Sequence, residues 1–150
     1  MFYIEETSIM NASLRLCSSL DQNHILQLVE LYQNEWWTKD RVQADVELML
    51  QNTDFIFAYL DNENNLAAFA RVLSDHVYKA FIFDVIVKPS LRNSGTGSRI
   101  LHDIISHPVL TEVKTIELYC RPELESFYHS FGFSTDLNDT SFMRRLRDPR

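Results

Sequence analysis

The stretch Val87-Lys88-Pro89-Ser90-Leu91-Arg92-Asn93-Ser94-Gly95-Thr96-Gly97 decides the fold prediction, because it joins a strongly apolar segment to a helical pattern. Before it, residues 80–87 form a nearly unbroken apolar run, which predicts a central strand buried on both faces. After it, apolar residues recur at helical spacing over residues 97–107, and Pro108 ends the pattern. The stretch is therefore predicted to be a loop between a strand and a helix.

Glycine is scarce in this chain, with 3 among 150 residues, where average usage of about 7% would give about ten. Two of the three, Gly95 and Gly97, lie in this loop. Glycine permits positive φ and close approach to the backbone, and Asn93 tolerates positive φ better than most residues. Three cations surround the loop: Lys88, Arg92 and Arg99. Because loop amides and the first N–H groups of a helix converge on an anion, the loop is a candidate phosphate site.

A second motif, Tyr128-His129-Ser130-Phe131-Gly132-Phe133, contains the third glycine. It closes a predicted helix over residues 122–131, which has proline in its first turn and glycine just past its end. Tyr128 lies on the apolar stripe of this helix and is predicted to face inward. From periodicity alone, Tyr128 is a core tyrosine with a satisfied hydroxyl.

Further strands and helices are predicted along the rest of the chain. Strands are expected at residues 13–17, 55–60, 66–73, 115–119 and 141–146, and helices at residues 20–37 and at 38 with 41–51. The second helix is expected to bury Val42, Val46, Leu48 and Leu50. This order predicts a mixed α/β (α+β) chain that forms one domain over residues 1–150.

The composition excludes several classes of function. A net charge of −7 argues against nucleic acid as the main partner, and it is compatible with a cationic substrate. No apolar run approaches the roughly 18 residues of a membrane span, and the start has no secretory signal, so no membrane partner is expected. Cys17 and Cys120 form no metal-type pair and are expected to be reduced thiols in the cytoplasm. No metal site is expected.

The loop matches neither common nucleotide fingerprint, since no Gly-Lys-Ser/Thr follows and Ile100 stands where a third glycine would be. Instead, valine-x-proline at Val87 followed by Arg92-x-x-Gly95-x-Gly97 resembles the acyl-CoA loop of the GNAT superfamily of N-acyltransferases. Tyr128-x-x-x-Gly132-Phe133 resembles the second recurring signature of that superfamily. The resemblance covers the chain from about Leu20 to its end. The chain looks like a bacterial subgroup of small members of the superfamily, many of which have no assigned substrate.

The resemblance implies a central, mostly antiparallel sheet with a splayed central strand pair, flanked by helices. It implies that acetyl-CoA is the co-substrate and that its pyrophosphate is held by Arg92, Asn93, Ser94, Gly95, Thr96, Gly97 and Ser98. It implies that the central strand offers Val85, Ile86 and Val87 to the pantetheine arm. It also implies that Tyr128 protonates the departing thiolate and that Trp36 and Trp37 lie in the substrate lid. The family's usual glycine is replaced by Asn93, so the loop is expected to differ there.

Asp84 is the only polar side chain in its strand, where a carboxylate is costly unless it is paired or functional. It is either a catalytic base or the partner of an ion pair, with Arg71 on the neighbouring strand as the expected cation. Many relatives carry a glutamate base on the opposite face of this strand, where this chain is expected to place Phe81 and Phe83. Water or Glu35 is then the remaining candidate for removing a proton from the amine.

Trp36 and Trp37 are adjacent at the predicted end of the first helix, so at least one of them is expected near the surface or in a pocket. The expected activity is direct transfer of an acetyl group from acetyl-CoA to a primary amine of a small molecule. Two alternatives remain open: a protein or peptide amine as acceptor, and a CoA-binding module without turnover. A homodimer is possible.

Overall fold

The structure is a computed structural model that describes residues 13–147. Contacts within the chain divide it after Leu118 into two compact units, and each is described by itself. The first unit is a mixed α/β arrangement of one sheet with helices on both faces, which confirms the expected fold class. The single domain over residues 1–150 stays a prediction.

The sheet contains five strands in the order β1-β2-β3-β4-β5. Their bounds are β1 (Arg15–Cys17), β2 (Phe55–Leu60), β3 (Leu66–Ser74), β4 (Lys79–Val87) and β5 (Thr115–Glu117). The first four strands are antiparallel to their neighbours, and β5 runs parallel to β4. The sheet is therefore mostly antiparallel, and five of the expected strands are confirmed with ends shifted by at most two residues.

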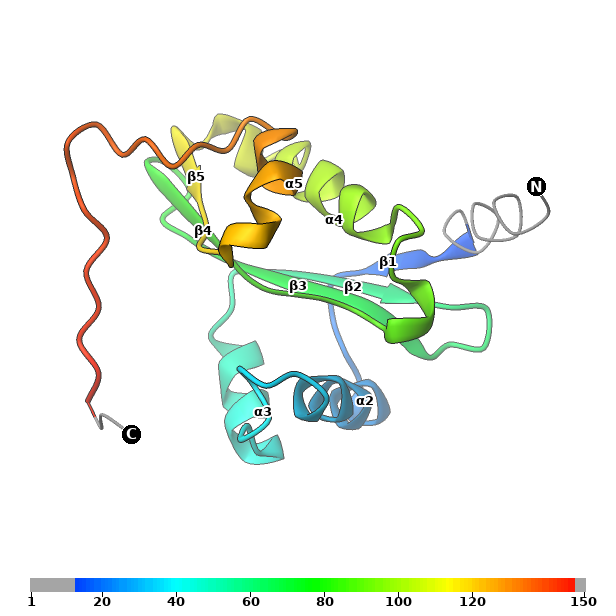
Figure 1. Ribbon diagram of the computed structural model, residues 1–150. Helices are drawn as coiled ribbons and strands as arrows, with labels where there is room; N and C mark the ends of the chain where they lie inside the picture. The colour runs from blue at the N-terminus through cyan, green and yellow to red at the C-terminus, as the bar shows by residue number, and fades with distance from the viewer. Residues whose placement is uncertain (1–12, 148–150) are drawn as a thin grey trace. The chain divides into compact units, whose positions relative to one another are not determined.

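Helices cover both faces of the sheet. Two of them, α2 (Gln22–Gln33) and α3 (Gln43–Gln51), lie together on one face, and α4 (Thr96–Ile105) lies on the other (Figure 1). The first helix begins at Gln22, two residues later than expected, where the Asp21 carboxylate caps it by accepting a hydrogen bond of 2.8 Å from the His24 amide. Leu28, Tyr32 and Phe69 are fully buried between this helix pair and the sheet. Short 3₁₀ turns, η1 (Pro89–Leu91) and η2 (Leu110–Glu112), flank α4.

Two helix expectations are corrected. The first helix ends at Gln33 rather than Trp37. Beyond it, the Asn34 amide donates to the Leu31 carbonyl and the Thr38 hydroxyl donates to the Tyr32 carbonyl at 2.8 Å, so groups outside the helix satisfy carbonyls of its last turn. The second helix buries only Val46, whereas Val42 and Leu48 are exposed and Leu50 is half-buried. This helix contacts the core through Val46, with Met49 and Leu50 partly buried against it, while Leu48 points outside.

The strand β4 has buried residues on both faces, because Ile82 pairs with Val72 and Ile86 pairs with Phe69, and Val72 and Phe69 point to opposite faces of β3. Its residues alternate between buried and half-buried positions from Ala80 to Val87. The expected unbroken buried run is therefore corrected, because Phe81, Phe83, Val85 and Val87 are only half-buried.

The second unit contains η3 (Pro122–Leu124) and α5 (Glu125–His129), so the expected helix over residues 122–131 begins as a 3₁₀ turn and is shorter. The expected strand at residues 141–146 is wrong, because the structure shows this segment as exposed, extended chain without a strand partner among residues 13–147. Phe142, Met143 and Leu146 are exposed there, and without a partner strand the alternation of side chains alone does not form a ladder.

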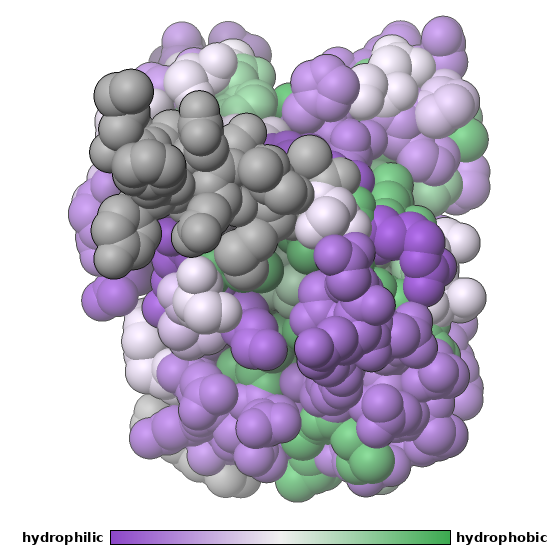
Figure 2. All heavy atoms as spheres, turned by 90° about the vertical axis from the view of Figure 1, so that its right-hand side faces the viewer, coloured by the Kyte–Doolittle hydropathy of each residue, from purple (hydrophilic) through white to green (hydrophobic). Residues whose placement is uncertain are grey.

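No helix within residues 13–147 is long and apolar enough to span a membrane. On the face drawn in Figure 2, hydrophobic residues appear in separate patches between hydrophilic ones, as far as the grey atoms leave it visible. Such scattered apolar residues are ordinary for a protein surface.

Candidate active site

The strand β4 contains a β-bulge at Asp84. Phe69 pairs with Ile86 and Arg71 pairs with Phe83, so Ala70 alone faces two residues of β4. Asp84 has φ of +56°, a left-handed conformation that is rare for a residue other than glycine. Bulges of this kind redirect side chains and are frequent beside active sites.

The bulge places two successive side chains on one face of the sheet. The Arg71 guanidinium lies 4.7 Å from the centre of the Phe83 ring, and its Nε is 2.7 Å from the Asp84 carboxylate. The expectation that Phe83 and Asp84 lie on opposite faces is therefore wrong, because it assumed regular alternation along the strand.

The carboxylate of Asp84 is the centre of a buried polar cluster. Arg41 donates two hydrogen bonds to it, at 2.7 and 3.2 Å, and Tyr32 donates a third from its hydroxyl at 2.9 Å. Arg71 completes the set at 2.7 Å. The ion pair expected between Asp84 and Arg71 is confirmed, and a catalytic part for Asp84 stays a prediction.

The electrostatics of the cluster keep Asp84 ionised. Burial alone raises the pKa of Asp84, but the hydrogen bonds and charges of Arg41 and Arg71 outweigh it and hold the pKa below its usual value. Burial and the Asp84 charge raise the pKa of Tyr32, so its hydroxyl remains a donor. A carboxylate with such strong donors is a weak proton acceptor, which favours the structural interpretation.

Beyond the parallel pairing with β5, the strand β4 continues toward the loop with β3 on one side only. The pairs with β5 end at Phe81, whereas the pairs with β3 continue to Val87. This divergence is the splayed strand pair that was expected. Within the described residues, β5 therefore leaves the edge of Val85, Ile86 and Val87 without a strand partner, and an extended amide ligand can approach backbone there. A contact from Ile86 would use its backbone, because its side chain belongs to the core.

The loop after β4 contains two left-handed residues. Asn93 has φ of +60° and Gly95, the N-cap of α4, has φ of +86°. The prediction of positive φ at Asn93 is confirmed, and this residue adopts the conformation that glycine takes most easily. Ser94 lies between them and contacts the hydroxyl of Thr96 at 3.0 Å.

The first turn of α4 follows this loop directly. Thr96 is buried, while Gly97 and Ser98 lie in the same turn with greater exposure. Gly97 does not have a positive φ, so its backbone conformation does not require glycine. The absence of a side chain there would instead let a ligand approach the backbone closely. The N–H groups of a first helical turn have no intrahelical acceptor, and they favour an anion.

Of the three cations expected around the loop, one is directed elsewhere. Arg99 donates to the Leu14 carbonyl at 2.8 Å and lies over the Tyr59 ring, which joins α4 to the β1 and β2 side of the sheet. Lys88 and Arg92 are exposed at the loop. The Nε of Arg92 donates to the Val87 carbonyl at 3.1 Å, and its terminal nitrogen forms an ion pair with Glu35.

The segment of residues 34–41 carries the two tryptophans and is fastened at both ends. Glu35 pairs with Arg92 of the loop, and Arg41 pairs with Asp84 at the bulge. Between these contacts, Trp36 and Trp37 are 64% and 42% exposed. The expectation that at least one tryptophan lies near the surface is confirmed, and substrate binding by this pair stays a prediction.

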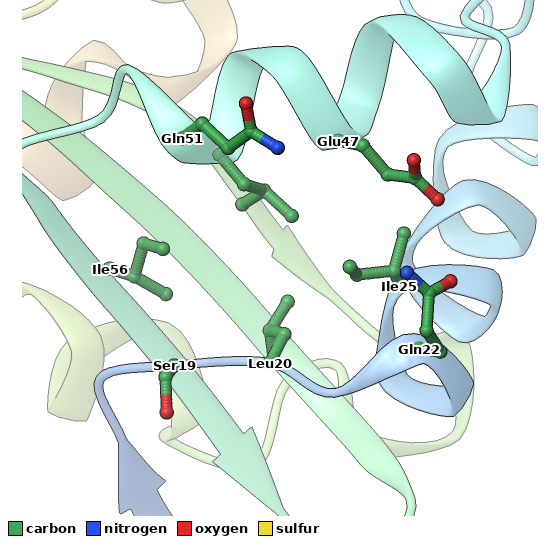
Figure 3. A pocket seen from close by; sticks show the side chains of 8 residues that line it. Ser19, Leu20, Gln22, Ile25, Glu47, Gln51 and Ile56 are labelled. Carbon is green, nitrogen blue, oxygen red and sulfur yellow. The ribbon is translucent and has the colours of Figure 1, made fainter.

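Two hollows of the first unit lie near these elements. One of about 310 Å³ adjoins the start of the loop at Lys88, Ser90 and Leu91. The other, of about 250 Å³, is a groove between α2 and α3 and is drawn in Figure 3. Its lining includes Glu47 and Gln51 but none of the loop residues, nor Trp36 or Trp37.

Tyr128 belongs to the second unit and is buried there, as expected. Its ring packs against Phe127 and Phe133 with centroids 5.0 and 6.0 Å away. Burial, together with the nearby Cys120, raises the pKa of Tyr128 to about 12. Gly132 has φ of +87°, and the Phe133 amide bonds the Tyr128 carbonyl at 3.2 Å to close the helix.

These features combine a splayed strand, a bulge and a left-handed loop at a helix start. The model of the Acetyltransferase (GNAT) family matches residues 22–133 of the chain. The chain belongs to this family. The match includes both the loop at Gly95 and the motif from Tyr128 to Phe133.

Named relatives of this GNAT acetyltransferase agree with the assignment. Uncharacterized N-acetyltransferase ycf52 of Pyropia yezoensis is 31% identical over 79% of this chain and 70% of that protein. GCN5-related N-acetyltransferase 1, chloroplastic, of Arabidopsis thaliana is 31% identical over 73% of this chain and 58% of that protein. The chain thus spans 58% to 70% of the length of these two relatives.

A solved structure supports the fold of this acetyltransferase. A protein of Xanthomonas campestris pv. campestris, described as belonging to the GNAT family, superimposes with a TM-score of 0.76 at 27% identity. The superposition covers 89% of this chain and 92% of that one. The family and the fold are therefore established together.

Sequence reasoning missed several residues around the loop and bulge. Tyr32 and Arg41 were not expected at Asp84, and the pairing of Glu35 with Arg92 was not expected. The only available signal was the carboxylate of Asp84 in an apolar strand. Burying it is unfavourable without partners, but the sequence does not indicate which residues those partners are.

Proposed function

We propose that this GNAT acetyltransferase transfers the acetyl group of acetyl-CoA directly to the primary amine of a small molecule. The observation that carries the proposal is the left-handed pair Asn93 and Gly95 at the start of α4, beside the half-paired end of β4. This arrangement has the donors that a pyrophosphate needs: backbone N–H groups, the positive end of a helix dipole, and the charges of Lys88 and Arg92.

In the proposed reaction, the free amine attacks the thioester carbonyl and forms the C–N bond, the C–S bond breaks, the nitrogen loses a proton to water, and the thiolate takes a proton. Tyr128 is the proposed donor of that last proton, as the resemblance implies; its phenol is protonated at neutral pH, and water returns the proton to it afterwards. The ammonium form of the acceptor loses its proton before attack, to water or to Glu35. Asp84 is less suited to this step, because Arg41 and Arg71 hold its proton affinity low.

A small acceptor is supported by the two exposed tryptophans, Trp36 and Trp37, which can close over a compact ligand and attract a cation to their ring faces. Relatives matched over about half of the chain differ in their acceptors. One is named Serotonin N-acetyltransferase 2, chloroplastic, of Oryza sativa subsp. japonica, at 35% identity, and another Histone acetyltransferase TAP1 of Glycine max, at 29%. A protein or peptide acceptor is therefore the second candidate.

The test is to incubate the purified protein with acetyl-CoA and a panel of small primary amines and lysine peptides, following thiol release. Turnover on small amines with little on peptides is the expected result. Turnover on peptides alone would favour the second candidate. CoA binding without turnover on either would favour a binding module that lacks catalysis.

The loop assignment makes a separate prediction. Changing Gly95 to alanine strains a left-handed residue by about 1–2 kcal/mol and displaces the loop amides. We expect the dissociation constant of acetyl-CoA, measured by calorimetry, to rise at least about tenfold, a change of about 1.4 kcal/mol.

Gly132→Ala is the matched control for this variant. Gly132 has nearly the same φ, and a methyl group there would meet no atom within 4 Å. It carries the same kind of strain outside the loop, so acetyl-CoA affinity should stay unchanged. Equal affinities for the two variants would remove the loop from the proposed site.

The place of action and the assembly stay predictions. We retain a cytoplasmic location as the expectation from the cysteines, although the Arabidopsis thaliana relative is named as chloroplastic. A homodimer is also retained, and sedimentation of the purified protein would decide it.

A further inference from the structure

The ion pair between Glu35 and Arg92 connects two segments that the proposed function assigns to different substrates. Arg92 belongs to the loop proposed for the pyrophosphate, and Glu35 directly precedes Trp36 and Trp37. The Arg92 side chain is about half exposed, and that of Glu35 is 20% exposed. Both groups are therefore open to a ligand, and the pair is not locked in the core.

Arg92 is held in place independently of Glu35. Its Nε donates to the carbonyl of Val87, the last residue of β4, at 3.1 Å. This bond to backbone uses Nε and leaves the terminal N–H groups of the guanidinium for an acid. Within the described residues, a terminal nitrogen of Arg92 donates to Glu35.

A pyrophosphate on this guanidinium would compete with Glu35. The phosphate and the Glu35 carboxylate carry like charges, so they would repel each other on the same guanidinium. A phosphate also makes stronger charge-assisted hydrogen bonds to a guanidinium than an exposed carboxylate does. Binding of the pyrophosphate to Arg92 should therefore break the ion pair between Arg92 and Glu35.

The released carboxylate would lie beside the two exposed tryptophans. A carboxylate next to aromatic faces is a suitable environment for an ammonium ion, which pairs with the charge and lies against the rings. The segment stays in position after release, because Thr38 is buried and Arg41 remains bound to Asp84. The displacement is therefore limited to the Glu35 side chain.

We propose that Glu35 is a positioning residue that couples the two substrates: the pyrophosphate displaces it from Arg92, and it then binds the ammonium of the acceptor. The proposal rests on the proposed function. Because coupling between two sites is reciprocal, a bound ammonium that holds Glu35 away from Arg92 also favours the pyrophosphate.

The test measures CoA affinity by calorimetry in four proteins: wild type, Glu35→Gln, Arg92→Gln and the double variant. Removing the competitor in Glu35→Gln should lower the dissociation constant of CoA about three- to fivefold. Arg92→Gln should raise it about tenfold or more. In the Arg92→Gln background the effect of Glu35→Gln should disappear, since the two changes act through one contact.

Glu47→Gln is the control for charge. Glu47 lies on α3 at the groove of Figure 3 and accepts a hydrogen bond from Gln43. Its neutralisation changes the net charge by the same amount without touching Arg92. CoA affinity should stay as in wild type, which separates a local contact from the general field of an acidic protein.

The acceptor side gives a second readout. With acetyl-CoA saturating, Glu35→Gln should raise the KM for the best amine of the panel about tenfold, while Glu47→Gln leaves it unchanged. A Glu35→Gln variant whose CoA affinity is unchanged or weaker would overturn the coupling and leave the proposed function standing. A wild-type protein that binds no CoA would overturn both.

Discussion

Replacing Asp84 with alanine is expected to lower the free energy of unfolding by about 3–5 kcal/mol, measured by urea denaturation at pH 7. The carboxylate neutralises Arg41 and Arg71 and accepts the Tyr32 hydroxyl in a buried site. Its removal leaves two partly buried guanidinium groups with excess charge and deprives the buried Tyr32 hydroxyl of this acceptor. Most of the lost stability comes from leaving these groups without a partner rather than from the lost contacts themselves.

Glu117→Ala is the comparison for this prediction. Glu117 on β5 pairs with Lys79 at the start of β4, and both side chains are substantially exposed. Ion pairs of this kind contribute about 0–1 kcal/mol. If the two alanine variants lose similar stability, the Asp84 cluster does not hold the bulge.

The same cluster predicts a pH dependence. Because the pKa of Asp84 is lower in the folded protein, its contribution is complete above the unfolded value of about 3.9 and is lost as the pH falls through the folded value. The stability difference between wild type and Asp84→Ala should therefore be constant from pH 5 to 7 and shrink below about pH 4. A difference that grows on acidification would reverse the assigned shift.

Changing Tyr128 to phenylalanine is expected to lower kcat about 100-fold or more, while the dissociation constant of acetyl-CoA stays nearly unchanged. The substitution removes one hydroxyl and keeps the ring packed against Phe127 and Phe133. A pKa of about 12 keeps the phenol protonated through neutral pH, which is the form that a proton donor requires.

Tyr119→Phe is the control, because it removes a phenol hydroxyl from an exposed tyrosine of the same unit. It should leave both kcat and acetyl-CoA affinity as in wild type. Turnover by Tyr128→Phe at the rate of Tyr119→Phe would exclude Tyr128 as the acid. A loss of acetyl-CoA affinity in Tyr128→Phe would instead indicate a structural role.

Local patterns were sufficient for much of the fold. The strand β2 was predicted with its observed ends, because residues 55–60 form an apolar segment bounded by polar residues and a turn. The loop was recognised from Arg92, Gly95 and Gly97, and the positive φ of Gly95 agrees with the use of glycine there. The ion pair of Asp84 with Arg71 was expected from the adjacency of their strands.

What remained hidden depends on contacts far apart in sequence. The bulge at Asp84 is a choice of register between two strands, and no single residue of β4 encodes it. Arg41 reaches Asp84 and Glu35 reaches Arg92 only because α2 ends at Gln33, several residues before the apolar pattern does. At that end the Thr38 hydroxyl donates to the Tyr32 carbonyl, a local contact that the apolar pattern does not indicate.

The bulge also makes β4 sensitive to the number of its residues as well as their identity. Since Ala70 faces two residues, the strand beyond Asp84 is one residue out of step with the half before it. Deleting Asp84 would restore even pleating and leave Ile86 opposite Phe69, but it would remove the carboxylate that Arg41, Arg71 and Tyr32 share. When variants are designed or family sequences are aligned, a gap at this position therefore indicates loss of the bulge and of its polar cluster, while the pairing of the strand up to the loop is kept.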